Sequence, residues 1–301
     1  MTYNIGGHNI RISFDGEETM LDTLLHSFVP FKTTVNDDAD MLMHLHVVKY
    51  LKEIPEEDRR LIRDVDTGNG MTRVDKLKNG GYQFLVRDIY GVPCALLITS
   101  AHFDDCRCAL RGSMQTKRFA LNNALMLAYA FSAAYYDTLL IHASVIRHND
   151  KAYAFTAKSG TGKSTQVANW MRNIEGCDIV NDDNPIIRII DGKPILFGSP
   201  WSGKTPCYRN IKVNLGAIVL IERAQSNSVT PMIPLQGFTT LLTACSAMKW
   251  DEELYQRVCK TVSLFVESTQ VVTLHCLPDA DSAHTCRAYL EDNNNFIEYK
   301  R

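Results

Sequence analysis

The rhythm of hydrophobic and polar positions changes near residue 113. Before that point, short apolar or alternating stretches are separated by turn signals, as in NIRISF, DMLMHLHVV, GYQFLVRDIYG and VPCALLITS. Alternation with a period of two is typical of β-strands. One polar stretch, IPEEDRRLI, favours a helix, because Pro55 precedes three acids suited to a helix's first turn. We therefore predict a β-rich N-terminal region over residues 1–112.

The rest of the chain predicts alternating strands and helices. Residues 116–136 contain few helix breakers and are apolar on most sides, which indicates a buried helix. Five apolar runs then predict strands, namely LLIHASVI, AYAFTA, CDIVNDD, GAIVLIERA and VVTLHCL, and PIIRIIDGKPILFGS predicts a hairpin turning at Asp191–Gly192. Helical stretches lie between and after them: KSTQVANWMRN, LQGFTTLLTACSAM, DEELYQRVCKTVSLFVEST and DADSAHTCRAYLED. This alternation predicts an α/β domain over residues 113–301.

Composition narrows the class of protein. With 301 residues, of which 45% are hydrophobic, the chain can bury a large core, and a net charge of -2 argues against nucleic acid as a partner. The start of the chain lacks the pattern of a signal peptide, and the longest apolar stretch carries Asn122 and Asn123, so we expect no membrane contact. Nine scattered cysteines indicate buried thiols of a cytoplasmic protein, since Cys106 and Cys108 are too close for the usual zinc spacing.

The stretch AFTAKSGTGKSTQVANW carries the strongest chemical signal. It fits the phosphate-binding pattern G-x-x-x-x-G-K-[ST] of the Walker A type, except that Ala157 stands at the first glycine position. Glycines let backbone amides approach a phosphate, the helix N-terminus favours an anion, Lys163 reaches the phosphates and the Ser164 hydroxyl holds Mg²⁺. The predicted nucleotide-binding residues are Ser159, Gly160, Thr161, Gly162, Lys163, Ser164 and Thr165. The alternative is an ordinary glycine-containing turn between strand and helix.

Two adjacent acids follow the next predicted strand, in DIVNDDNP. In a parallel sheet the carboxyl ends of neighbouring strands meet at the edge that carries the phosphate-binding loop. One carboxylate at that edge completes a Mg²⁺ shell with Ser164, and the other accepts the proton of an attacking hydroxyl. The alternative is a strand-ending turn, because Asp-Asp-Asn-Pro is also good turn chemistry.

Together these stretches resemble a known superfamily. HASVIRHNDKAYAFTAKSGTGKSTQVANW, then NDDNP, then GSPWSGK, is similar to the C-terminal domain of HPr serine kinase/phosphorylase, whose fold is shared with ATP-dependent phosphoenolpyruvate carboxykinase. HPr-kinase-like proteins of bacterial peptide-biosynthesis clusters match best. The resemblance covers residues 140–221 well. It implies an α/β P-loop core of this type, which follows the β-rich region along the chain. Assembly into a homo-oligomer is left open.

The resemblance also implies a function and roles for single residues. It implies that ATP and Mg²⁺ are the cofactors and that a serine hydroxyl of a peptide or small protein is the acceptor. Asp182 is then the base and Asp183 the metal-side acid, with an exchange of these two roles left open. His142 matches a histidine that lies near the transferred phosphate, whereas a histidine in LLIHASV taken alone is more often a satisfied core residue.

The chain departs from the family beyond the acids. HPr kinase/phosphorylase has a Glu-x-Arg-Gly stretch there, and this chain has GSPWSGKTPCYRN instead, so neither action on HPr nor the reverse reaction is expected. Lys204 is a candidate ligand of phosphate or an acidic substrate, Trp201 a stacking or packing surface, and Arg209 a solvated side chain. The chain is also much shorter than phosphoenolpyruvate carboxykinase and lacks an evident Lys/His metal pair, which disfavours that activity.

Other residues receive structural interpretations. His44 and His46 share one strand face, which we interpret as solvated rather than metal-binding, because no third ligand is apparent. Glu222 and Arg223 are expected to form an ion pair at a strand end. Two functions besides a peptide serine kinase stay open: a kinase of a small molecule, and a nucleotide-binding regulator without catalysis.

Overall fold

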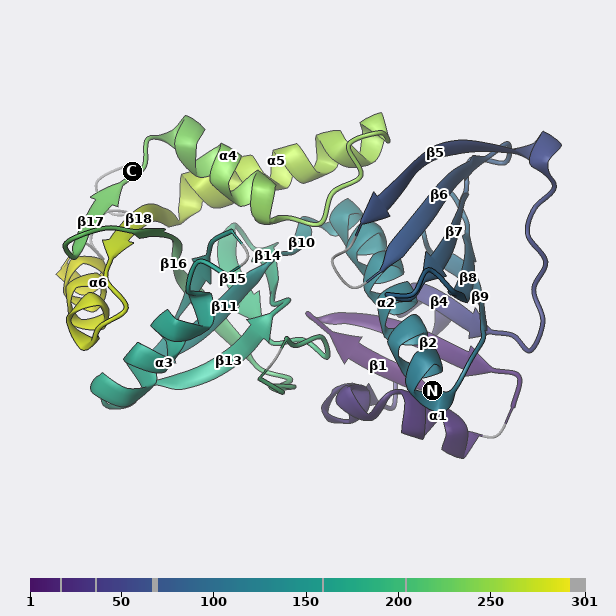
Figure 1. Cartoon of the computed structure of the whole chain (residues 1–301), viewed down its shortest axis with the longest axis horizontal. Coiled ribbons are helices and arrows are strands. Elements are labelled where there is room, and N and C mark those ends of the chain that lie inside the picture. Colours follow the sequence, from purple (N-terminus) through teal and green to yellow (C-terminus); the bar gives the residue numbers. More distant parts are fainter. Residues whose placement is uncertain (17, 36, 67–69, 159, 204, 293–301) are drawn as a thin grey trace. The chain divides into compact units, whose positions relative to one another are not determined.

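The protein consists of two compact mixed α/β units, the first spanning Met1–Tyr136 and the second beginning at Asp137 (Figure 1). This description rests on a computed structural model and covers residues 1–16, 18–35, 37–66, 70–158, 160–203 and 205–292. The boundary lies later than the expected division between residues 112 and 113. The reason is that the helix following residue 113 packs on the first sheet and so belongs to the first unit.

The first unit is built on a nine-stranded sheet. Its central strands β2, β4 and β9 run parallel, and its other neighbours pair antiparallel. The predicted β-rich character is therefore confirmed. The order across the sheet is β3 (Lys32–Thr33), β1 (Thr2–Ile5), β2 (His8–Phe14), β4 (Met41–Val47), β9 (Asp105–Leu110), β8 (Pro93–Thr99), β7 (Tyr82–Arg87), β6 (Met71–Leu77) and β5 (Arg59–Asp66).

The helix predicted in IPEEDRRLI is wrong. Only a single 3₁₀ turn, Glu56–Asp58, follows Pro55, and the chain then enters β5, which pairs with β6. The three acids correctly indicated a helical turn, but the turn does not continue into a helix. The backbone groups of the residues that follow are satisfied instead by the pairing of β5 with β6. Short helical segments elsewhere in the unit are α1 (Glu18–Leu24), His26–Phe31, Asp38–Asp40 and Ala134–Tyr136.

One long helix, α2 (Met114–Ala133), covers a face of the first sheet. It begins after Ser113, whose hydroxyl accepts a hydrogen bond from the backbone N–H of Thr116 at 3.2 Å and so caps the first turn. Its buried hydroxyls find backbone partners on the sheet: Tyr129 donates to the carbonyl of Ile5 and Ser132 to that of Leu42. The predicted buried helix is confirmed, but it begins two residues earlier than expected and ends at Ala133, where a 3₁₀ turn over Ala134–Tyr136 follows.

The two histidines of β4 have partners on β2 and directly after its end. His44 Nε2 lies 2.8 Å from the hydroxyl of Ser13, and His46 Nε2 lies 2.7 Å from a carboxylate oxygen of Asp15. Both rings are half-buried and stack on one another. Among the residues that the structure describes, no cluster of three or more potential metal ligands occurs, here or elsewhere.

All nine cysteines are free. Cys106 and Cys108 are completely buried on β9, and burial raises the pKa of the Cys108 thiol to about 12. Such thiols are protonated and inaccessible at neutral pH, which makes them small apolar core residues.

A buried carboxylate ties three strands of the first sheet together. Asp75 on β6 is 1% exposed and accepts hydrogen bonds from Arg59 of β5 at 3.0 Å, from Arg73 at 3.2 Å and from the amide of Gln83 on β7 at 3.2 Å. The Gln83 carbonyl oxygen in turn accepts from the backbone of Ile54 at 2.8 Å. This network therefore also anchors the connection between β4 and β5.

We expect Asp75→Ala to lower the free energy of unfolding by about 3 kcal/mol, because Arg59, Arg73 and the amide of Gln83 all lose a buried acceptor. The ion pair of Arg59 with Glu53, at 2.8 Å, remains in this variant. Urea unfolding measures the change. Asp58→Ala is the matched control: its ion pair with Lys78 is exposed on both sides, and it should cost under about 0.5 kcal/mol. Equal effects of the two substitutions would show that Asp75 contributes no more than a surface charge.

The second unit is built on a second sheet of nine strands. It contains the predicted adjacent strands, the hairpin and the long apolar strands, and it adds the short strand β17, which no sequence pattern indicated. The main order is β10 (Thr138–Leu140), β14 (Ile186–Ile190), β15 (Lys193–Phe197), β16 (Lys212–Arg223), β12 (Lys151–Thr156), β11 (Ala143–His148) and β13 (Asp178–Asp183), with β18 (Gln270–Cys276) on β16 and β17 (Ser228–Pro231) on β18.

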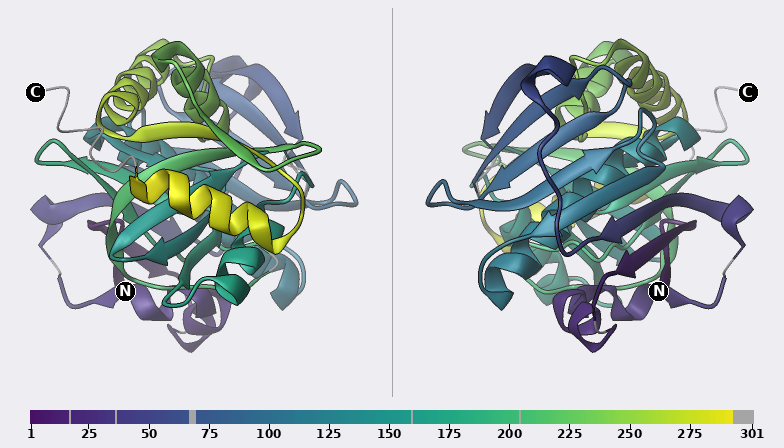
Figure 2. Two further views of the ribbon diagram at one scale, coloured as in Figure 1. Left: turned by 90° about the vertical axis from the view of Figure 1, so that its left-hand side faces the viewer. Right: turned by 90° about the vertical axis from the view of Figure 1, so that its right-hand side faces the viewer.

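Helices cover both faces of this sheet. α3 (Lys163–Asn173) and α6 (Ala280–Asp292) pack together over β12, β16 and β18 (Figure 2). Trp170 of α3 is fully buried in that cluster. α4 (Pro234–Ala244) packs against α5 (Glu252–Ser268), which contacts β10, β14 and β15. Within the described parts of the chain, no helix is long and apolar enough to cross a membrane.

Candidate active site

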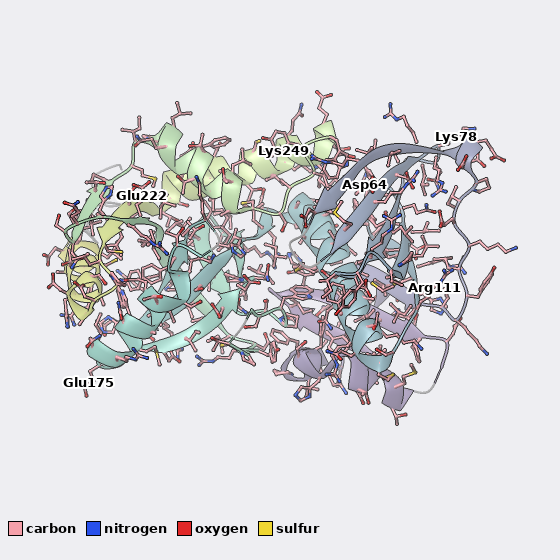
Figure 3. All side chains as sticks on the ribbon, viewed as in Figure 1. Asp64, Lys78, Arg111, Glu175, Glu222 and Lys249 are labelled. Atoms are coloured by element: carbon pink, nitrogen blue, oxygen red, sulfur yellow. The ribbon has the colours of Figure 1, made fainter. Side chains whose placement is uncertain are left out.

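The loop between β12 and α3 has the backbone of an anion-binding turn. Gly160 has φ +76° and Gly162 has φ +138°, a region that side-chain-bearing residues rarely adopt. Lys163 is the first residue of α3, and the helix runs from there toward Glu175, labelled just beyond its far end in Figure 3. Lys163 therefore adds its positive charge to the positive, N-terminal end of the helix dipole.

Strand topology brings the acid pair to the same edge of the sheet. β11 lies between β12 and β13 and is antiparallel to both, so β12 and β13 run in the same direction with their carboxyl ends at one edge. The expectation that the two strands are parallel neighbours is therefore wrong in detail. The amino end of β11 lies at that edge too, which places His142 beside the acids.

Lys163, His142 and Asp183 form a hydrogen-bonded chain. Lys163 Nζ lies 2.7 Å from His142 Nε2, and His142 Nδ1 lies 3.1 Å from Asp183 Oδ1. A charged ammonium has only donors, so Nε2 accepts and Nδ1 carries the proton that is donated to Asp183. His142 is 47% exposed at its side chain and is thus no buried core residue. The histidine is a direct link between the lysine of the loop and a carboxylate of β13.

Asp182 is the buried member of the acid pair, 5% exposed. Its Oδ1 accepts a hydrogen bond from the hydroxyl of Ser144 at 2.6 Å, and its Oδ2 accepts from the backbone N–H of Thr205 at 3.3 Å. Asp183, 34% exposed, also accepts at Oδ2 from the amide of Asn184 at 2.8 Å. The two carboxylates therefore differ in access and in partners.

Ser144 was not among the residues predicted for the site. It is fully buried on β11, two residues after His142, and its hydroxyl contacts Asp182, whereas His142 contacts Asp183. The pattern His-x-Ser at the start of a strand was the available signal. Asn181, also fully buried, is a second such residue: its amide donates to Ser199 and to the carbonyl of Trp201, which ties β13 to the loop that follows β15.

The backbone at the acids is strained. Asp183 has φ +114°, which favours glycine, and a backbone bridge joins it to Ser202. Gly203 donates its N–H to the carbonyl of Asp182, and a Cβ on Gly203 would lie 3.1 Å from the Cβ of Asp183. Strain of this kind persists only where surrounding contacts hold it, and it is concentrated at functional sites.

Burial and charge shift two of the ionisable groups. Burial lowers the pKa of the Lys163 ammonium, an effect that the carboxylates of Asp183 and Asp182 oppose. Burial alone would raise the pKa of Asp183, but the hydrogen bond from His142 and the charge of Lys163 outweigh it, and the pKa lies below its usual value. Asp183 is therefore ionised at neutral pH.

Arg223, at the end of β16, contacts the loop rather than Glu222. Its Nη2 donates to the carbonyl of Gly160 at 2.8 Å, and its Nε donates to that of Thr161 at 3.2 Å. The Glu222 carboxylate lies 3.5 Å from His275 Nδ1 instead. The expected ion pair between the two neighbours is wrong, because successive side chains of a strand point to opposite faces.

The remaining predicted residues fall into three groups. Ser164 and Thr165 are exposed in the first turn of α3, beside Lys163. Trp201 is 5% exposed and serves as a packing surface, and Arg209 is paired with Asp178 at the start of β13, the end away from the acids. Ser159 and Lys204 lie outside the described residues.

The residues present fit a nucleotide phosphate with a divalent cation. The glycine backbone and helix N-terminus form a cradle that a side chain at position 160 or 162 would strain, and Lys163 supplies a positive charge. Ser164 and the carboxylate of Asp183 are the oxygen ligands that Mg²⁺ prefers beside phosphate oxygens. Ala157 is 9% exposed at the start of the loop.

Comparisons with known proteins give little beyond this. No family model matches the chain, and no curated protein matches it. Among solved structures, the HPr(Ser) kinase/phosphatase from Coxiella burnetii is similar at 10% identity, covering 53% of this chain and 98% of that one with a TM-score of 0.31. This similarity is distant.

Proposed function

We propose that the protein is a Mg²⁺·ATP-dependent kinase that transfers a phosphoryl group to a serine hydroxyl of a peptide or small protein. The proposal rests on one observation: three separate segments of the chain bring Lys163, His142 and the two acids together next to the glycine loop. A nucleotide cradle alone would need the lysine but not the acid pair.

Each residue has a task in this proposal. The loop amides and Lys163 would hold the phosphates, and Ser164 and Asp183 would hold the cation, which neutralises charge on the phosphate oxygens when bound. The lowered pKa of Asp183 suits a metal ligand, which must be ionised. His142 orients Asp183 and contacts Lys163, and so keeps both groups at the edge where the acceptor enters.

Asp182 would accept the proton of the acceptor hydroxyl. Ser144 fixes one of its oxygens at 2.6 Å, whereas the contact of the other with Thr205 is longer, 3.3 Å. An acceptor hydroxyl takes the place of that weaker partner at Oδ2. The strained link between Asp183 and Ser202 holds the loop that carries Thr205 next to the acids.

Two measurements test the proposal. Isothermal titration with ATP, ADP and a non-hydrolysable ATP analogue, each with and without Mg²⁺, should give cation-dependent binding. Incubation with γ-labelled ATP and an array of serine-containing peptides should then transfer label to serine. Transfer to small hydroxyl compounds alone would identify a small-molecule kinase, and binding without any transfer would identify a regulator. Absence of nucleotide binding would overturn the proposal.

A further inference from the structure

A side chain of another strand, β16, donates hydrogen bonds to the loop that joins β12 to α3. β16 is the parallel neighbour of β12, so the carboxyl ends of both strands lie at one edge, and Arg223 is the last residue of β16. Its guanidinium bridges two consecutive carbonyls, those of Gly160 and Thr161. No other strand of the site reaches these carbonyls through a described side-chain hydrogen bond.

The bridge fixes the direction of the loop amides. The chain has no cis peptide bond among its described residues, so the N–H of each peptide group points away from its own carbonyl. Anchoring the Thr161 carbonyl at Arg223 therefore turns the Gly162 N–H to the opposite side. The N–H of Thr161 likewise points away from Arg223 and closes the turn on the carbonyl of Lys158 at 3.1 Å.

Glycine makes this anchoring necessary. Residues 160 and 162 both have positive φ, and glycine reaches many other conformations at similar cost, so a loop built from it loses more entropy when it is ordered. A planar guanidinium with five donors can hold two carbonyls in one geometry, whereas an ammonium acts as a single point charge.

We infer that Arg223 is a positioning residue of the phosphate-binding loop, which orders the loop for the phosphates of a nucleotide and acts without direct contact to the reacting atoms. This inference rests on the proposed function, since it concerns the same nucleotide. Glu222 and Arg223 then have separate roles at the end of β16, one toward His275 and the other toward the loop.

The test compares Arg223→Gln, Arg223→Lys and Arg209→Gln with the unchanged chain. Titration with ATP and Mg²⁺ should show about tenfold weaker affinity for Arg223→Gln, as expected when hydrogen bonds made by a charged group are lost. Arg223→Lys should recover only part of the affinity, since an ammonium lacks the fixed planar arrangement of donors with which the guanidinium holds the two carbonyls. Arg209→Gln removes an equal charge at the far end of β13 and should leave the affinity unchanged.

Melting temperature without nucleotide separates positioning from a merely structural role. Arg223 is exposed, so Arg223→Gln should melt within about 2 °C of the unchanged chain. Equal ATP affinity in the unchanged chain and Arg223→Gln would overturn the inference and leave the proposed function intact. A melting temperature that falls in step with affinity would also overturn it. If the unchanged chain binds no nucleotide, the proposed function fails, and the inference fails with it.

Discussion

Lys163→Ala is expected to lower kcat/KM for phosphoryl transfer by about 10²–10³-fold, the effect of removing one preorganised charge from a developing anion. The ammonium stands at the N-terminus of α3, where it adds to the helix dipole, and burial lowers its pKa, so it is less solvated than a surface lysine. Affinity for Mg²⁺·ATP should fall as well, because the same charge faces the phosphates in the ground state. Titration and single-turnover transfer measure the two effects separately.

Lys193→Ala is the matched control for this change. Lys193 is an exposed lysine at the start of β15, at the hairpin turn away from the acids. Its loss should alter neither affinity nor rate by more than about twofold, since the charge is screened by solvent at that distance. If Lys163→Ala retained transfer within a factor of ten of the unchanged chain, the loop would not hold the transferred phosphate.

Asp182→Asn and Asp183→Asn are expected to separate the two acids. Asp182→Asn should lower kcat by about 10²–10⁴-fold, as expected for loss of a positioned base, with ATP affinity nearly unchanged. Asp183→Asn should instead raise the Mg²⁺ concentration needed for half-maximal binding, because an amide is a neutral and weaker ligand of a hard cation. A Mg²⁺ titration of nucleotide binding, followed by transfer at saturating Mg²⁺, measures both.

Asp178→Asn is the control for these substitutions. It removes a carboxylate from the same strand, β13, but at the end that pairs with Arg147 and Arg209. It should leave Mg²⁺ dependence and kcat unchanged. If Asp182→Asn changes the Mg²⁺ requirement and Asp183→Asn only the rate, the two roles are exchanged. Unchanged transfer in both variants would remove the acid pair from the mechanism.

Many strands and turns could be predicted because they depend on residues that are close together in the sequence. Period-two alternation indicated the strands of the first sheet, and the hairpin turn at Asp191–Gly192 is confirmed, with φ +50° and +73° at its two residues. The wrong helix after Pro55 and the unpredicted strand β17 depend on pairing with distant segments. Pairing across a sheet is decided by tertiary contacts, which a short window of sequence does not contain.

Residue type and spacing along the chain were enough to locate the phosphate-binding pattern. The glycines, Lys163 and the acid pair have chemistry that follows from residue type and spacing, and local backbone preference is enough to place the loop before a helix. Their order along the chain also placed Lys163 at the start of that helix, where the structure has it.

The contacts among these residues depend on segments that are distant along the chain. The insertion of β11 between β12 and β13 brings His142 between Lys163 and Asp183, and it places Ser144 against Asp182. The partner of Arg223 was likewise decided by β16 lying beside β12 rather than by the adjacent Glu222. Hydrogen bonds act over about 3 Å, so they report which segments meet in space, and sequence neighbours carry no such information.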